Sequence, residues 1–297
     1  MFAQAAFWRW VPHPEVWVLV AGLVGLYAYA VKVIGPKAVR PGQPVLTPLN
    51  KLCFVAGIGL LWLVTDWPVH DIGEQYLFLV HMSQHLVLTL VVAPLMLLAT
   101  PEWLARLVLG RGRVDRWVHR LARPVPAALL FNGLLLLTHW QTVVNRASED
   151  ALFHYGVHSA LMVTALLLWM PVCGPLRELR IPLPTQMLYL FITSIVPTVP
   201  GAWLTFAEGA VYSAYDIPDR LWGISVTTDQ QAAGLIMKLA GGTYLWVLIA
   251  TIFFVWANRH DDEADGRGGA PAAREVLTWD EVQREFETTP APAEPTP

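Results

Sequence analysis

The chain has 297 residues, of which 55% are apolar and only 14% are charged. A soluble globular domain has about 25% charged residues, so this balance argues against an ordinary soluble protein and favours one that lies in a lipid bilayer. The formal net charge is −3, and we expect no nucleic-acid partner.

The apolar residues fall in long runs, and a helix that crosses a bilayer needs about 20 of them. Seven segments qualify, so we predict an all-α integral membrane protein, a bundle of seven transmembrane helices. The segments lie near residues 15–34, 49–66, 75–98, 125–144, 151–172, 184–207 and 229–257. The first residues lack a basic region and a small-residue cleavage site, so we expect no removable signal peptide.

The lysines and arginines predict the orientation of the bundle. Sixteen of the 20 lie in the first, third and fifth connections or after the last segment, whereas Arg9, Arg146 and Arg220 lie on the other side and Lys238 lies inside a segment. Short cytoplasmic loops collect basic residues. We therefore expect the N-terminus outside and the C-terminus in the cytoplasm.

The third connection and the sixth segment each contain a pattern that predicts a particular conformation. Residues 101–124 alternate apolar side chains with arginines, which is typical of an amphipathic segment on the anionic inner leaflet. In the sixth segment, Pro197, Pro200 and Gly201 remove helix hydrogen bonds and predict a kink.

The last residues differ from the rest in composition. We expect a membrane domain over residues 1–258 and a largely disordered cytoplasmic tail over 259–297, because the tail is rich in acidic residues, Ala, Pro and Thr. Within it, Thr278 and Glu281 form a capping box, which predicts a short helix near residues 279–287. We expect this helix to dock onto a partner or onto the inner loops.

Five of the nine histidines fall inside the predicted segments, where titratable residues are rare and usually functional. Two pairs are spaced four apart, so each pair projects from one helix face. At about 1.5 Å of rise per residue, all five lie within roughly 15 Å of the outer surface. We predict one metal-binding layer made of His81, His85, His139, His154 and His158.

Other residues are expected to support this layer. Asp66 follows the second segment, and Asp229 and Gln230 begin the seventh at the same surface. Met82 follows His81, and Met162 lies four residues beyond His158. Imidazole suits copper, zinc and iron, whereas thioethers select copper(I). Copper is therefore the preferred ion, with zinc or haem as alternatives.

The order and spacing of four motifs resemble the multi-spanning CtaG family of cytochrome c oxidase assembly factors. The motifs are His81-Met-Ser-Gln-His85 followed by APLMLLATPEW, Thr138-His139-Trp140, His154-Tyr-Gly-Val-His158 leading to LWMPV, and Asp229-Gln-Gln-Ala-Ala-Gly234. The resemblance implies a multi-pass protein of the bacterial plasma membrane. It also implies that oxidase subunits are the partners and that copper handling is the role. Lys238 departs from the apolar residue expected at its position.

Three other functions fit parts of the pattern. A seven-span zinc hydrolase would use three histidines on zinc and Asp66 or Asp229 as general base. A redox protein would hold haem between His85 and His158. Lys238 in the seventh segment suggests retinal, but the third segment lacks the carboxylate needed as counter-ion. An assembly factor that is not an enzyme is the preferred interpretation.

Overall fold

The computed structural model describes residues 9–218 and 220–264, and every regular element in these ranges is a helix. Two compact units are distinguished, Met1–Phe253 and Phe254–Pro297. The first holds all the features discussed below. The predicted tail helix near residues 279–287 lies outside the described residues.

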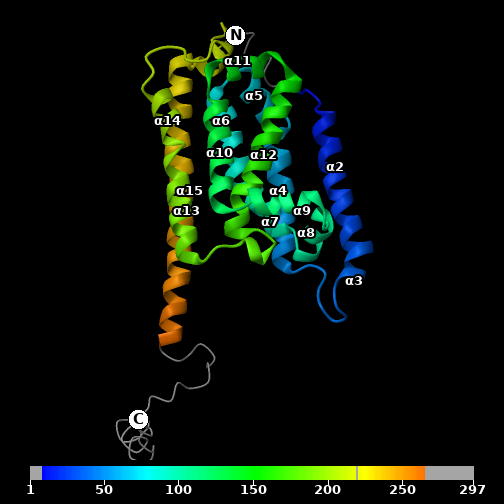
Figure 1. Cartoon of the computed structure of the whole chain (residues 1–297). Helices are drawn as coiled ribbons and strands as arrows, with labels where there is room; N and C mark the ends of the chain where they lie inside the picture. Colours follow the sequence, from blue (N-terminus) through cyan, green and yellow to red (C-terminus); the bar gives the residue numbers. More distant parts are fainter. Residues whose placement is uncertain (1–8, 219, 265–297) are drawn as a thin grey trace, which may run out of the picture. The chain divides into compact units, whose positions relative to one another are not determined.

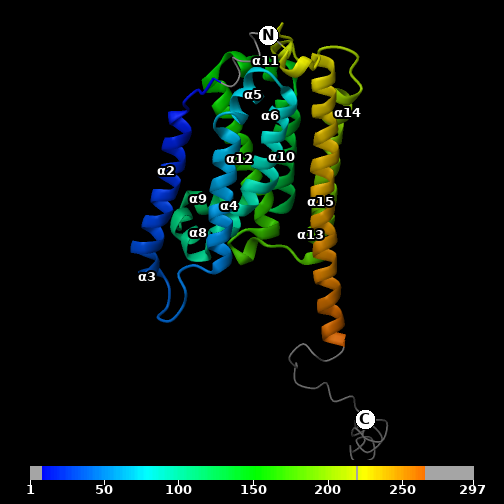
Figure 2. The same cartoon turned by 180° about the vertical axis from the view of Figure 1, so that it is seen from behind.

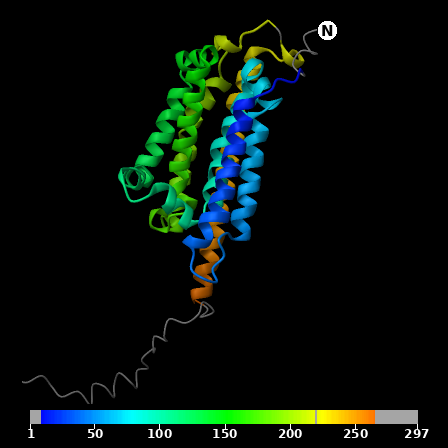
Figure 3. The same cartoon turned by 90° about the vertical axis from the view of Figure 1, so that its right-hand side faces the viewer.

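The first three predicted segments are observed as apolar helices. The first is formed by α2 (Pro14–Tyr29), η1 (Ala30–Ile34) and α3 (Gly35–Ala38), and the second by α4 (Pro48–Thr65). A short helix, α5 (Val69–Gln75), precedes the third span, which consists of α6 (Phe78–Leu86), η2 (Val87–Val92) and α7 (Ala93–Ala99). Figure 3 shows α2 and α4 side by side, and contacts between the two helices agree.

Prolines explain the two wide turns in these spans. The π-type turns η1 and η2 each lie just before a proline, Pro36 and Pro94. Proline has no N–H to donate, and its ring clashes with the carbonyl four residues earlier, so the preceding turn widens. Because η2 begins two residues after His85, it sets the register between the histidines and the rest of the span.

The fourth predicted segment is shorter than expected. Two short helices, α8 (Glu102–Leu109) and α9 (Arg113–Leu121), form the basic connection, and α10 (Pro124–Thr138) follows at an angle of 82° to α9. The segment was expected to reach residue 144, but the helix ends at Thr138 and the separate helix α11 (Gln141–Glu149) begins after Trp140. Trp140 has extended backbone angles that interrupt the helix.

The last three spans complete the bundle. They are α12 (Ala151–Cys173), the pair α13 (Leu183–Ile195) and α14 (Thr198–Thr205), and α15 (Val226–Ala264). The helix is interrupted where the kink was predicted, because α13 ends at Ile195 and α14 begins at Thr198, after Pro197. Among the described residues, six helices are long and apolar enough to cross a membrane, and a seventh span results if α9 and α10 count as one.

Helices α6, α10 and α12 lie together in the middle of the bundle, with α15 beside α13 (Figures 1 and 2). Helices α10 and α12, which belong to the fourth and fifth spans, make extensive contacts with each other. Helices α14 and α15 approach closely at two glycines, since a Cβ on Gly234 would lie 2.5 Å from the carbonyl oxygen of Gly201. Small residues permit such close approach of helices in membranes.

Candidate metal centre

Five titratable side chains from three helices meet in one place, hereafter the histidine–glutamate cluster. Its members are Glu74 of α5, His81 and His85 of α6, and His154 and His158 of α12. The ring centroid of His158 lies 4.5 Å from that of His85, 4.2 Å from that of His154 and 5.5 Å from that of His81. The two sequence pairs therefore meet as predicted, while their role as metal ligands stays a prediction.

Two overlapping sets of three ligand atoms occur among the described residues. One set comes from His81, His85 and His158, and the other from Glu74, His154 and His158; within each set the atoms lie within 4.8 Å of one another. The Nε2 atoms of His81 and His85 are 2.9 Å apart. Two nitrogens bound to one tetrahedral ion at about 2.0–2.1 Å would be about 3.4 Å apart, so a small adjustment allows both to bind one ion.

Glu74 orients two of these imidazoles. Its carboxylate lies 2.8 Å from Nδ1 of His81 and 3.4 Å from Nδ1 of His154. A histidine that binds a metal through one ring nitrogen usually donates the other N–H to a carboxylate or carbonyl. Burial by itself raises the pKa of Glu74, but the imidazoles of His81, His154 and His70 outweigh this effect and lower it to about 2. The carboxylate is therefore ionised near neutral pH and can hold both Nδ1–H groups.

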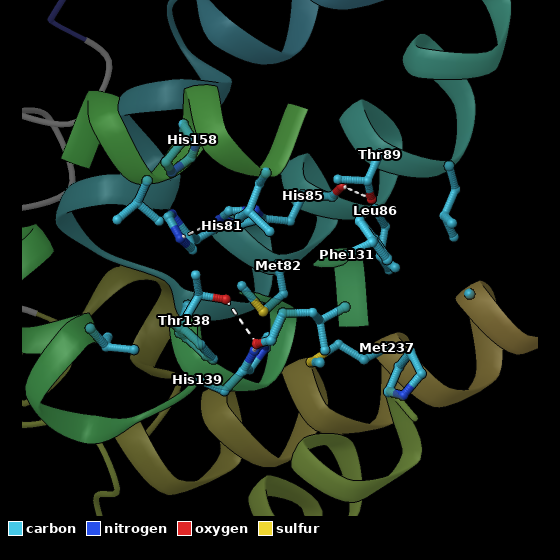
Figure 4. A pocket seen from close by; sticks show the side chains of 18 of the residues that line it. His81, Met82, His85, Leu86, Thr89, Phe131, Thr138, His139, His158 and Met237 are labelled. Carbon is cyan, nitrogen blue, oxygen red and sulfur yellow. Dashed lines mark hydrogen bonds between the residues drawn. The ribbon is translucent and has the colours of Figure 1, made fainter. Parts of the chain in front are cut away.

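The cluster lines one side of a cavity of about 100 Å³. In Figure 4 the labelled His81, His85 and His158 lie on one side of this cavity, with Met82, His139 and Met237 on the other. The remaining lining is largely apolar and comes mainly from α6, η2, α10, α11, α12, α13 and α15.

His139 is not part of either ligand set. It ends α10, its Nδ1 lies 2.7 Å from the carbonyl oxygen of Leu135, and its buried Nε2 has no hydrogen-bond partner among the described residues. In Figure 4 its ring lies across the cavity from His81, His85 and His158.

The predicted supporting residues are divided between the cavity and other parts of the fold. Met82 lines the cavity, whereas Met162 packs into the apolar core. Asp66 accepts hydrogen bonds from Nε1 of Trp17 and Trp62, at 2.9 and 2.7 Å. These contacts tie α2 to the end of α4 and leave Asp66 outside the cavity lining.

Asp229 and Gln230 hold the backbone of neighbouring segments in place. The buried carboxylate of Asp229 accepts the backbone N–H groups of Phe78 and Leu79 at 2.8 and 2.9 Å, and so caps the start of α6. Gln230 accepts the N–H of Val211 at 2.7 Å. Both residues position elements of the site rather than line the cavity.

A family model for the cytochrome c oxidase caa3 assembly factor, Caa3_CtaG, matches residues 25–259. The chain belongs to this family. The match covers the whole histidine–glutamate cluster and confirms the resemblance drawn from the sequence motifs. No curated protein and no solved structure matches the chain.

Two site residues of this Caa3_CtaG protein were missed by the sequence reasoning. Glu74 precedes the third predicted segment, which begins near residue 75, and neither Glu74 nor His70 was among the predicted site residues. The two residues are four apart, which is the spacing used to single out the other histidine pairs. The ring of His70 lies 6.3 Å from that of His154 and 5.0 Å from that of His13. That spacing was the available signal.

Proposed function

We propose that this Caa3_CtaG protein binds copper at the histidine–glutamate cluster and supplies it during maturation of a haem–copper cytochrome c oxidase. Family membership supports the assembly role. The observation that carries the copper proposal is the overlap of two three-ligand sets at His158. Copper is the cargo in this scheme.

The ligand chemistry supports a transition-metal ion. Four imidazoles and one carboxylate converge, and imidazole suits copper, zinc and iron. Hard ions such as magnesium and calcium prefer sites made of oxygen ligands. Copper is preferred over zinc because the family serves a copper-containing oxidase and because Met82 lines the same cavity.

The predicted orientation places the histidine–glutamate cluster near the outer surface of the membrane. With basic residues concentrated at the opposite end of the bundle, the cluster lies in the outer half of a bacterial plasma membrane. The N-terminus is then outside and the C-terminus is cytoplasmic. Oxidase subunits in the same bilayer are the proposed partners.

Two alternatives receive less support from the geometry. The proposed bases of a zinc hydrolase are engaged elsewhere, since Asp66 binds two indoles and Asp229 caps α6. Haem between His85 and His158 would place their coordinating nitrogens about 4 Å apart across the iron, with the ring centroids farther apart still. The centroids are only 4.5 Å apart.

The test is complementation of a strain that lacks this gene. We expect the strain to make oxidase polypeptides without oxidase activity, and wild-type protein to restore that activity. His158→Ala should fail to restore it and should weaken copper(II) binding by the purified protein at least about tenfold, because it removes a ligand from both sets. His119→Ala, which alters a histidine on α9, is the matched control and should behave as wild type.

Full oxidase activity and normal copper content in the deletion strain would overturn the assembly role. If His158→Ala lowered the activity but bound copper(II) normally, the cluster would be needed for another purpose. Comparable amounts of each variant in the membrane must be shown first by immunoblotting.

A further inference from the structure

The cavity has a second wall whose chemistry differs from that of the histidine–glutamate cluster. This wall carries Met82 of α6, His139 at the end of α10 and Met237 of α15, and all three residues line the cavity. Figure 4 shows the three side chains on the same side of the cavity, across from His158. Each is buried, with 5%, 8% and 5% of its surface exposed, respectively.

His139 is oriented as a ligand would be. Its Nδ1 lies 2.7 Å from the carbonyl oxygen of Leu135, so Nδ1 must carry the proton and donate it to this acceptor. Nε2 of a neutral ring is then a bare acceptor, and it is buried without a hydrogen-bond partner among the described residues. An unsatisfied buried nitrogen is costly, and N–H donation to a carbonyl by the other nitrogen is typical of histidines that bind metals.

The two methionines belong to one packed group. Met82 and Met237 pack in the same buried cluster as Tyr212, whose hydroxyl donates to the carbonyl oxygen of His139 at 2.8 Å. The backbone of His139 is thereby fixed next to the cluster that contains both thioethers. Both methionines border the cavity as well as this packed cluster.

We infer that His139, Met82 and Met237 form a separate copper(I) site, hereafter the thioether site. One imidazole nitrogen and two thioether sulfurs are a soft ligand set, and soft ligands select copper(I) over zinc and copper(II). The histidine–glutamate cluster offers only nitrogen and oxygen, so the same cavity carries two sites of different preference. The inference rests on the proposed function, because it divides the copper cargo between the two walls.

The thioether site is tested with the full-length protein purified in detergent. Affinity for copper(I) is measured anaerobically by competition with a chromophoric copper(I) chelator, and affinity for zinc(II) is measured separately. We expect Met82→Leu with Met237→Leu, and separately His139→Phe, to weaken copper(I) binding by at least about tenfold while zinc(II) binding stays within about twofold. Leucine and phenylalanine keep the apolar volume, and apparent melting temperatures verify that each variant is folded.

Two controls separate this inference from the proposed function. Met162→Leu makes the same substitution in the apolar core and should leave copper(I) affinity unchanged. His158→Ala should lose zinc(II) binding and keep copper(I) binding. X-ray absorption of the copper(I)-loaded protein should show sulfur neighbours that disappear in the double methionine variant.

Copper(I) affinity that is unchanged in the double methionine variant, or equally lowered by Met162→Leu, would overturn the thioether site. The proposed function would then still stand if His158→Ala abolished copper(II) binding. Conversely, copper(I) bound through sulfur, with no metal bound by the histidine–glutamate cluster, would support the thioether site and overturn the proposed use of the cluster.

Discussion

The two ends of the same helices differ in what they bury. The histidine end of α6 and α12 gathers titratable groups around a cavity. A few turns farther along, the same spans bury Ala93, Ala165, Leu168 and Trp169 with at most 2% of their surface exposed. The first end provides ligands and space, whereas the second is closely packed and contains no titratable cluster.

This difference assigns stability and function to separate parts of the bundle. Apolar side chains gain little by leaving lipid for a protein interior, so helices in a membrane associate mainly through packing and hydrogen bonds. Ala93 and Ala165 are completely buried, which lets their helices approach closely, and Trp169 fills the space between them. We infer that the packed end holds the spans in register so that the histidine end can remain open.

The largest expected effect comes from breaking the packed end. Trp169→Ala removes a side chain that is 2% exposed and whose Nε1 donates to the carbonyl oxygen of Thr89 at 2.8 Å. We expect a loss of about 3–5 kcal/mol of stability, as for large-to-small changes in cores. The apparent melting temperature in detergent should fall by several degrees or more, and metal binding should be lost with the fold.

Trp246→Ala is the matched control for that experiment. Trp246 lies on α15 with 54% of its surface exposed, so its removal should change stability by about 1 kcal/mol or less. Equal destabilisation by the two substitutions would contradict the assignment of stability to the packed end.

A smaller and different effect is expected at the histidine end. Glu74→Gln keeps the size of the side chain but removes the charge that holds His81 and His154. We expect affinity for divalent ions to fall about 10- to 100-fold, as for other residues that orient metal ligands, with little change in melting temperature. Isothermal titration with zinc(II) measures the affinity. Gln75→Glu, on the exposed side of α5, is a charge control and should not weaken binding.

If Glu74→Gln unfolded the protein as readily as Trp169→Ala, the two ends would not have the separate roles assigned to them. Unchanged affinity in a folded Glu74→Gln protein would instead remove the orienting role of the carboxylate.

Much of this organisation was predictable because apolar runs and histidine spacing are local properties of the sequence. The length of the apolar runs predicted the spans, and the prolines predicted the interruption near Pro197. The four-residue spacing of the histidines predicted the convergence of His81, His85, His154 and His158. The end of α10 was not predicted, because residues 139–144 contain no proline or glycine that would mark the break observed at Trp140.

The roles of individual polar residues were harder to predict for a related reason. Asp66 and Asp229 lie near the histidines in sequence order, but which backbone or indole N–H each accepts depends on neighbouring helices. Glu74 was missed because a break at Tyr76 and Leu77 turns α5 back over α6. Sequence spacing within a single helix carries no information about such a turn.

The smallest expected effect lies where α2 joins the histidine end. Both ring nitrogens of His13 face carboxylates, Nε2 that of Asp71 at 3.0 Å and Nδ1 that of Glu15 at 3.1 Å, and the protonated ring donates to both. Burial lowers the pKa of His13, but the carboxylates of Asp71 and Glu15 outweigh burial and raise it above 6.5. A raised pKa in the folded state means that the protonated pair contributes stability below the unfolded value of 6.5.

That contribution should disappear as the pH rises through the raised pKa. The difference in apparent melting temperature between wild type and His13→Gln should therefore be largest near pH ~6 and shrink toward pH ~8, with a maximum worth about 1 kcal/mol, the typical net value of one hydrogen bond. Asp71→Asn should produce the same loss, and combining it with His13→Gln should add little, because both substitutions break one contact. A difference that grows with pH would show that His13 is held in its neutral form, and α2 would then be attached to α5 by packing instead of charge.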